Sequence, residues 1–114
     1  MRLLVTGGRY YRGYTKLFAR LDELSPDVII HGDNGCTDIA ADVWAILRGL
    51  IPGKTLLRFP ADWKAYGKGA GPVRNQQMID IGQPTHVLAA PGHSGTDDMK
   101  RRAQAVGIEP IDLE

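Results

Sequence analysis

Glycine is the residue type whose distribution in this 114-residue chain points most directly to chemistry. The chain contains 14 glycines, whereas an average usage of about 7% predicts about 8. Nine of them fall in four short segments, and these are Gly7, Gly8, Gly32, Gly35, Gly67, Gly69, Gly71, Gly92 and Gly95. Glycine lets backbone N–H groups approach a ligand closely, and N–H groups at the start of a helix favour anions. These segments are therefore candidates for binding phosphate, although each of them alone could equally form only a tight turn.

The segment Pro91–Thr96 is the most specific of the four. It stands between an apolar run and a helical pattern, and after the proline it consists of Gly92, His93, Ser94, Gly95 and Thr96. A strand, a glycine-rich loop with hydroxyl groups and a helix, in this order, are typical of a phosphate-binding loop. The segment lacks the Gly-Lys-Ser/Thr ending of a Walker A loop, and Gly7-Gly8-Arg9 does not continue into the dinucleotide-binding fingerprint. The prediction of a phosphate ligand therefore rests on loop chemistry and not on either motif.

Arg74 and Asn75 lie at the start of a predicted helix. A cation there opposes the helix dipole, at a cost of about 0.3 to 1 kcal/mol, which favours a functional interpretation of Arg74 as a bidentate ligand of phosphate or carboxylate. The alternative is an ion pair with one of the 13 acidic residues. Asn75 could supply amide donors beside it. We predict both residues in the binding site, with Arg74 also a catalytic candidate.

Three aspartates are candidates for contacts with a ribose or for acid–base chemistry. Asp33 and Asp38 follow the second apolar run, and Asp98 lies in the first turn of the last predicted helix. Each also has a structural interpretation, because Asp38 suits a helix N-cap and an acid in a first helical turn is favoured by the helix dipole. His31 and His93 belong to the same loops, so either could also contact the ligand. The histidines lack a short metal-ligand spacing and the chain has one cysteine, so no metal site is predicted.

Residues 60–70 show neither strand nor helix periodicity, and they form a connection about twice as long as usual. Trp63 and Tyr66 lie within it. These aromatic side chains could stack on a nucleotide base, or they could only hold the loop against the body of the protein. Trp63 is included among the predicted ligand-binding residues.

Apolar runs and helical patterns alternate along the chain and determine where these candidates lie. The predicted strands are 3–5, 28–30, 55–59, 85–90 and 108–113, and the predicted helices are 17–24, 37–47, 73–81 and 96–106. Such alternation requires parallel pairing through right-handed crossovers. We therefore predict an α/β fold, a Rossmann-like three-layer sandwich with a parallel five-stranded sheet in the order 3-2-1-4-5. Strand-to-helix loops of such a sheet share one edge, so the glycine segments should converge.

Length, charge and hydropathy exclude several classes of protein. A chain of 114 residues predicts one domain, residues 1–114. With 14 basic and 13 acidic residues the net charge is +1, which provides no field for attracting nucleic acid or an anionic membrane. No apolar run approaches the roughly 18 residues of a membrane span. A cytoplasmic protein without membrane contact and without a bound cofactor is expected.

Five motifs, taken together and in order, resemble the YspA/YpsA-type members of the SLOG superfamily over residues 3–108. The motifs are Thr6-Gly7-Gly8-Arg9, His31-Gly32-x-x-Gly35-x-x-Asp38-x-x-Ala41, Phe59-Pro60-Ala61-Asp62-Trp63, Gly71-Pro72-x-Arg74-Asn75-x-x-Met78 and Pro91-Gly92-x-x-Gly95-Thr96-x-x-Met99. This superfamily joins the Lonely Guy phosphoribohydrolases with the DNA-processing protein A. The resemblance implies a Rossmann-like fold, a nucleotide-type ligand, a phosphate cradle at Gly92–Thr96 and a place for Arg74 in the pocket.

The complete set of predicted ligand-binding residues follows from these loops and motifs. It comprises Gly7, Gly8, Arg9, Gly32, Asp33, Gly35, Asp38, Trp63, Arg74, Asn75, Gly92, His93, Ser94, Gly95 and Thr96. Arg74 and Asp98 are the catalytic candidates.

The chain departs from the Lonely Guy enzymes where they have a catalytic glutamate, because Met99 stands there. A thioether cannot act as a general acid or base, and loss of such a group typically costs about 10²- to 10⁴-fold in rate. The resemblance therefore favours a module that binds a nucleotide or an ADP-ribose-like ligand, in order to sense or sequester it. Similar stand-alone domains are often encoded by phages or plasmids, and relatives dimerise, so a homo-oligomer is expected.

Two alternatives remain open at the level of sequence. The first is a phosphoribohydrolase or other nucleotide N-glycosidase that uses Asp98 or Asp38. The second is single-stranded DNA binding, for which Lys64, Lys68 and Arg74 near Trp63 supply part of a basic, aromatic groove. The net charge of +1 argues against this second alternative.

Overall fold

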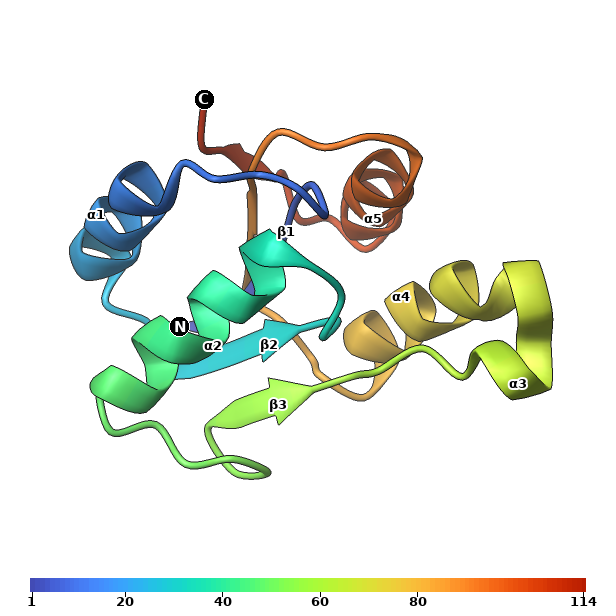
Figure 1. Ribbon diagram of the computed structural model, residues 1–114, viewed down its shortest axis with the longest axis horizontal. Coiled ribbons are helices and arrows are strands. Elements are labelled where there is room, and N and C mark those ends of the chain that lie inside the picture. The colour runs from blue at the N-terminus through green and yellow to red at the C-terminus, as the bar shows by residue number, and fades with distance from the viewer.

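The computed structural model describes residues 1–114 and contains one parallel five-stranded sheet between two layers of helices (Figure 1). The strands are β1 (Arg2–Thr6), β2 (Val28–His31), β3 (Leu56–Arg58), β4 (His86–Ala89) and β5 (Ile111–Asp112). Their order across the sheet is β3-β2-β1-β4-β5, and each neighbouring pair is parallel. The predicted fold class and strand order are confirmed.

The helices divide between the two faces of the sheet. They are α1 (Tyr14–Leu24), α2 (Cys36–Leu47), α3 (Trp63–Tyr66), the 3₁₀ helix η1 (Gly67–Gly69), α4 (Ala70–Asp80) and α5 (Ser94–Ala105). Figure 1 shows α1 and α2 on one side of the sheet and α4 and α5 on the other. None of these helices combines the length and the apolar composition that a membrane crossing requires.

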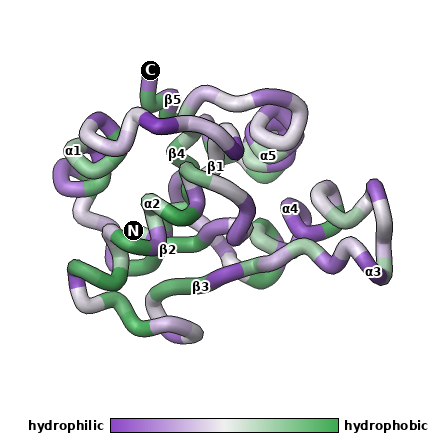
Figure 2. Tube along the Cα trace, viewed as in Figure 1, coloured by the Kyte–Doolittle hydropathy of each residue, from purple (hydrophilic) through white to green (hydrophobic).

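The hydrophobic core has two parts because successive side chains of a strand point to opposite faces. Along β1, Leu3 and Val5 pack with α1 and α2, whereas Leu4 packs with Met78 of α4 and Met99 of α5. The central strands are buried on both faces, which explains why they read as short continuous apolar runs. In Figure 2 the core-lining β2 and α2 are largely hydrophobic, and the α3 segment is mostly hydrophilic.

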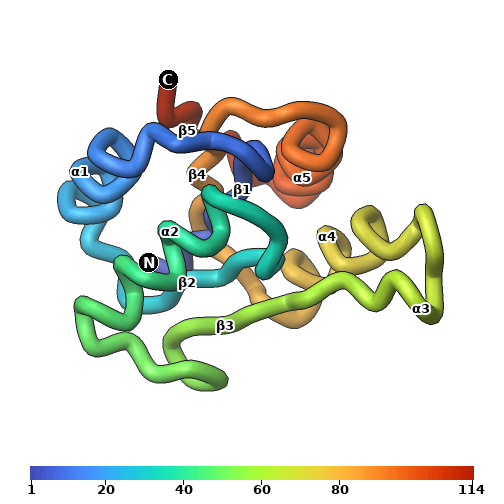
Figure 3. Tube along the Cα trace, in the orientation of Figure 1, coloured from blue at the N-terminus to red at the C-terminus, as the bar shows by residue number.

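The connection before α4 is helical, although its sequence shows no period. The Asp62 carboxylate caps α3 by accepting a hydrogen bond of 3.0 Å from the N–H of Ala65. A single turn is too short to produce a recognisable pattern. In Figure 3 this segment lies at the end of the molecule opposite α1. The chain then enters α4 at Ala70, three residues before the predicted start, with Pro72 in the first turn, where no N–H is needed.

Other boundaries also differ from the predictions, and α1 begins at Tyr14, three residues before its predicted start. The N-cap of α2 is Gly35, so Thr37 and Asp38 lie inside the first turn and do not cap it. Helix α5 begins at Ser94 and not at Thr96. Strand β5 covers only Ile111–Asp112, because Pro110 just before it has no N–H to donate to a neighbouring strand.

Candidate functional site

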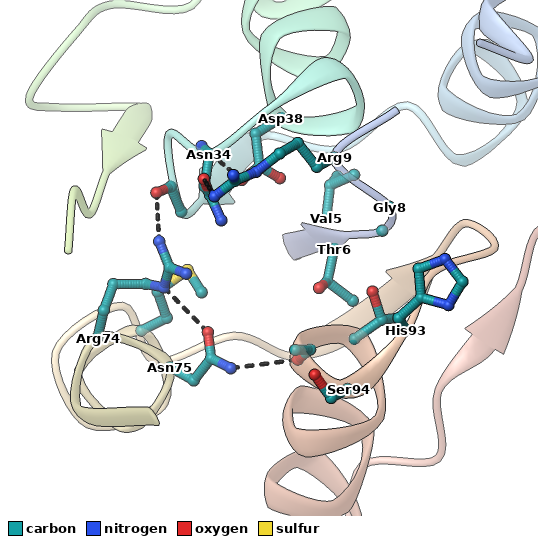
Figure 4. Close-up of a pocket in the computed structure, with 15 residues that line it drawn as sticks. Val5, Thr6, Gly8, Arg9, Asn34, Asp38, Arg74, Asn75, His93 and Ser94 are labelled. Carbon is teal, nitrogen blue, oxygen red and sulfur yellow. Dashed lines mark hydrogen bonds between the residues drawn. The ribbon is translucent and has the colours of Figure 1, made fainter. Parts of the chain in front are cut away.

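The loops that follow β1, β2 and β4 meet the start of α4 at the carboxyl edge of the sheet and enclose a cavity of about 260 Å³ (Figure 4). Eleven of the predicted ligand-binding residues line it, and these are Gly7, Gly8, Arg9, Gly32, Asp38, Arg74, Asn75, His93, Ser94, Gly95 and Thr96. The structure thus brings together residues from the β1–α1, β2–α2 and β4–α5 loops and from α4. The remaining lining residues are Val5, Thr6, Asn34 and Met78.

Hydrogen bonds connect the walls of the cavity to one another. The N–H of Gly8 donates to the carbonyl oxygen of Pro91 at 2.8 Å, and the hydroxyl of Thr37 donates to the carbonyl oxygen of Gly8 at 2.9 Å. The N–H of Cys36 donates to the carbonyl oxygen of Arg9 at 2.8 Å. A Cβ atom at Gly8 would lie 2.7 Å from the Pro91 oxygen, so this close approach of two loops requires glycine.

The start of α5 offers a run of unused backbone donors. The N–H groups of residues 92–96 have no acceptor within the chain, and the first to find one is that of Asp97, which donates to the carbonyl oxygen of His93 at 3.0 Å. No side chain caps this helix. Four of these five residues line the cavity. Consecutive free N–H groups at a helix start form an anion-binding concavity.

Arg74 is a buried cation without a counter-ion. Its side chain comes from the first turns of α4, the residue is 7% exposed, and no carboxylate lies within 4.0 Å of it. Its Nε donates to Asn75 Oδ1 at 3.0 Å, and its Nη1 donates to the carbonyl oxygen of Gly32. Nη2 makes no hydrogen bond within the chain, and the residue lines the cavity. The alternative of a structural ion pair is therefore not what the structure shows.

The carboxyl group that lines the cavity is that of Asp38. The residue is 7% exposed, and its Oδ2 accepts a hydrogen bond of 3.0 Å from the N–H of Asn34. Burial raises the pKa of Asp38 to about 6, although the charges of His31 and Arg74 act in the opposite direction. A carboxyl group that exchanges a proton near neutral pH can serve as a general acid or base.

Asp98, the predicted catalytic candidate, does not line the cavity. Its Oδ2 accepts hydrogen bonds from Arg102 Nε at 2.8 Å and from Asn75 Nδ2 at 2.9 Å. Burial acts to raise the pKa of Asp98, but the hydrogen bonds from Arg102 and Asn75 outweigh it, so the pKa lies below its usual value. Met99 is fully buried in the core under α5. Among the acidic residues considered from the sequence, only Asp38 faces the cavity.

Comparison with known proteins gives one informative relative. The chain is 37% identical over 121 aligned residues to the "Gene 61 protein" of Mycobacterium phage D29, and the match covers 98% of this chain and 95% of that protein. The chain belongs to the family of this phage protein. No known family model matches the sequence. The phage origin of the relative agrees with the expected association with phages or other mobile elements.

In this member of the Gene 61 protein family, four predicted ligand-binding residues lie outside the cavity lining. The N–H of Asp33 donates to His31 Nδ1, and its side chain lies with Asp42 and Arg58 on the outer side of the loop. Trp63 is half exposed on α3. Gly35 (φ 101°) packs against the backbone of Arg9, and Gly92 forms the turn beneath Thr96.

His31, considered a possible ligand contact from the sequence, is structural. It is fully buried, and its Nε2 lies 2.7 Å from Asp42 Oδ2. Its Nδ1 accepts the N–H of Asp33, so Nε2 carries the proton that faces Asp42. Asn34 is the polar lining residue that the sequence reasoning missed. Its place in the second glycine loop was a signal, but the spacing does not show which side chains of that loop turn inward.

Proposed function

We propose that this protein binds a nucleotide or a nucleotide-derived, ADP-ribose-like ligand at the carboxyl edge of its sheet, and that it acts in the cytoplasm as a sensor or a sequestering module. One observation carries the proposal: the free N–H groups at the start of α5 and the unpaired guanidinium of Arg74 line the same cavity. Both kinds of donor favour phosphate. The other lining residues are mostly polar and suit the hydroxyl groups of a sugar.

The size of the cavity indicates which part of a nucleotide it takes. At about 260 Å³ it is smaller than the roughly 300 to 1,000 Å³ typical of pockets for drug-sized ligands. A phosphorylated pentose therefore fits within it, and the base of a nucleotide would extend toward solvent.

Titration calorimetry with AMP and with ADP-ribose tests the proposal. We expect saturable binding of both ligands, and we expect Arg74→Gln to weaken the binding of ADP-ribose, which carries two phosphates, by about tenfold or more, because a charge-assisted hydrogen bond contributes about 1.5 to 3 kcal/mol. Arg20→Gln is the matched control, since Arg20 pairs with Glu23 on α1 and does not line the cavity. Absence of saturable binding of both ligands to the folded wild-type protein would contradict the proposal.

A second candidate function is hydrolysis of the N-glycosidic bond of a nucleotide, and the position of Asp38 favours it. A carboxyl group with a pKa of about 6 inside the cavity could protonate the departing base or activate the attacking water. Incubation with nucleoside monophosphates should then release free base, and Asp38→Asn should slow the release by about 10²- to 10⁴-fold. Binding without any release of base assigns the protein to the first function alone.

The proposal includes a homodimer formed through α2. The side of this helix that faces away from the sheet carries Ile39 and Leu47, which are 57% and 73% exposed, with Val43 and Ile46 between them. A helix that is apolar on nearly all sides is typical of one covered by a partner. Sedimentation analysis should show a dimer that Leu47→Lys converts to a monomer, whereas Ala19→Lys on the exposed side of α1 should leave it intact.

A further inference from the structure

The cavity contains two separate sets of donors for anions. The first set is the run of free N–H groups at residues 92–96. The second consists of two guanidinium groups, that of Arg74 from α4 and that of Arg9 from the β1–α1 loop. Figure 4 shows Arg9 and Arg74 reaching the cavity from one side, and His93 and Ser94 bordering it on the other.

Asn75 keeps the two sets apart. Its Oδ1 accepts from Arg74 Nε at 3.0 Å, and its Nδ2 donates to the carbonyl oxygen of Gly95 at 3.3 Å. The side chain of Asn75 therefore lies between the guanidinium and the start of α5. The Gly32 carbonyl oxygen accepts from Nη1 and holds the same guanidinium on the β2 side of the cavity. A phosphate seated on the N–H groups of α5 leaves the free Nη2 of Arg74 without a partner.

The side of the cavity formed by Arg9 and Arg74 has more positive than negative charge. Asp38 is the only acidic residue in the lining, whereas Arg9 and Arg74 contribute two positive charges. The Nη2 of Arg9 donates a hydrogen bond of 3.0 Å to Asn34 Oδ1. Asn34 is neutral, so this contact does not neutralise the charge of Arg9. Even with Asp38 ionised, this side keeps a net positive charge. Arg9 is exposed and partly screened by water, but Arg74 is buried. A buried charge is stable when a partner neutralises it, so a second anion beside Arg74 is the natural occupant.

We propose that the ligand is a pentose that carries two separate phosphate groups, one held by the N–H groups at the start of α5 and the other by Arg74 and Arg9. Nucleoside bisphosphates and pentose bisphosphates share this chemistry. The inference rests on the function proposed above and specifies its ligand. The volume of about 260 Å³ accommodates the sugar with its two phosphates, while a base, if present, remains outside.

Calorimetric titration with paired probes tests the inference at fixed ionic strength. Adenosine 3′,5′-bisphosphate is compared with AMP, and ribose 1,5-bisphosphate is compared with ribose 5-phosphate. In each pair we expect the bisphosphate to bind at least about tenfold more tightly than the monophosphate. A gain in the adenosine pair alone identifies a nucleoside as the source of the sugar, and a gain of equal size in both pairs identifies the phosphorylated sugar as sufficient.

Two variants assign the second phosphate to its donors. Arg9→Ala alters an exposed side chain and leaves the core intact, and Arg74→Gln alters the buried one. Both should reduce the affinity for the bisphosphate toward that for the monophosphate. Both should change monophosphate affinity much less. Arg20→Ala should change neither affinity.

The outcomes separate this inference from the proposed function. Equal affinity for monophosphate and bisphosphate in both pairs would overturn the two-phosphate ligand and leave nucleotide binding in place. Circular dichroism establishes that Arg74→Gln is folded. If this variant loses as much monophosphate affinity as bisphosphate affinity, both donor sets bind one phosphate, and the inference is also overturned. Failure of all four probes to bind would overturn the proposed function itself.

Discussion

Asp38 combines burial with the absence of an ion pair, and this has a cost for folding. The pKa of Asp38 rises from 3.8 to about 6 because of burial. A group whose pKa is higher in the folded state stabilises the fold below its unfolded pKa, and this contribution is lost as the pH rises through the folded pKa. For Asp38 the loss runs from about pH 4 to about pH 6, so the ionised carboxylate destabilises the protein at neutral pH.

Replacing Asp38 by asparagine should therefore stabilise the protein at neutral and alkaline pH. The asparagine oxygen can still accept the N–H of Asn34, and no charge needs to be buried. We expect the free energy of unfolding at about pH 8 to rise by about 1 to 3 kcal/mol, and to change little near pH 4. Urea denaturation at both pH values measures this. Glu109→Gln, at an exposed position, should show no such difference, and a variant destabilised at pH 8 would contradict the prediction.

The same carboxyl group should make ligand binding depend on pH. A phosphate ligand is repelled by ionised Asp38, so the affinity for ADP-ribose, whose phosphates do not titrate in this range, should increase as the pH falls through about 6. His93 also lines the cavity and is the comparison position for this effect. Calorimetry on Asp38→Asn and on His93→Gln separates the two groups, and we expect only Asp38→Asn to flatten the profile.

At the scale of single elements, the first turn of α5 contains a glycine, which lowers the stability of the helix but leaves the backbone N–H groups accessible. Gly95 lies in this helical turn, and a Cβ atom added there would have no neighbour within 4 Å. Gly95→Ala should therefore raise the free energy of unfolding by about 0.5 to 1 kcal/mol. The added methyl group would narrow the lining and weaken AMP binding.

Gly69→Ala provides the matched control for this prediction. Gly69 precedes α4, has equally free space around its Cβ position, and does not line the cavity. Denaturation and calorimetry on the two variants should show that only Gly95→Ala weakens binding. Unchanged AMP affinity in Gly95→Ala would contradict a role for the α5 start in binding.

The elements differ in how well the sequence predicts them. Strands β1, β2 and β4 are buried on both faces, and their apolar runs predict them well. The α3 turn is capped by the hydrogen bond that the N–H of Ala65 donates to the Asp62 carboxylate, and a single capped turn produces no periodic pattern. The start of α5 lies two residues earlier than predicted because its first N–H groups are left free and no capping side chain marks them.

The candidate site shows a similar division. The sequence indicates Arg74 as a cation in the first turn of a helix, where it is locally unfavourable. Because α4 begins at Ala70, Arg74 lies one turn further in, where this effect is weaker, although the residue does line the cavity. Asp33 and Trp63 are predicted to bind the ligand but do not line the cavity, and their positions in the sequence do not distinguish them from the residues that do. The positive φ of Asp33, 52°, is a backbone property that turns its side chain to the outer side of the loop, and only the folded structure reveals it.

At the scale of the whole molecule, the balanced charge limits what the site can attract. A net charge of +1 provides no overall positive field, so a single-stranded oligonucleotide should bind no more than about threefold more tightly than its terminal nucleotide. The dependence of affinity on salt should be correspondingly shallow. Fluorescence anisotropy with a 5′-phosphorylated oligonucleotide measures both. Tight binding that falls steeply with added salt would instead indicate a nucleic-acid partner.

The hydrogen bond from the Gly8 N–H to the Pro91 carbonyl oxygen joins the β1–α1 and β4–α5 loops in the absence of a ligand. A receptor that is already rigid loses little entropy on capture and needs no closing motion. A site that keeps one shape on binding gives another protein no conformational change by which to detect occupancy. This favours a scavenger, which lowers the free concentration of its ligand, over a signalling receptor.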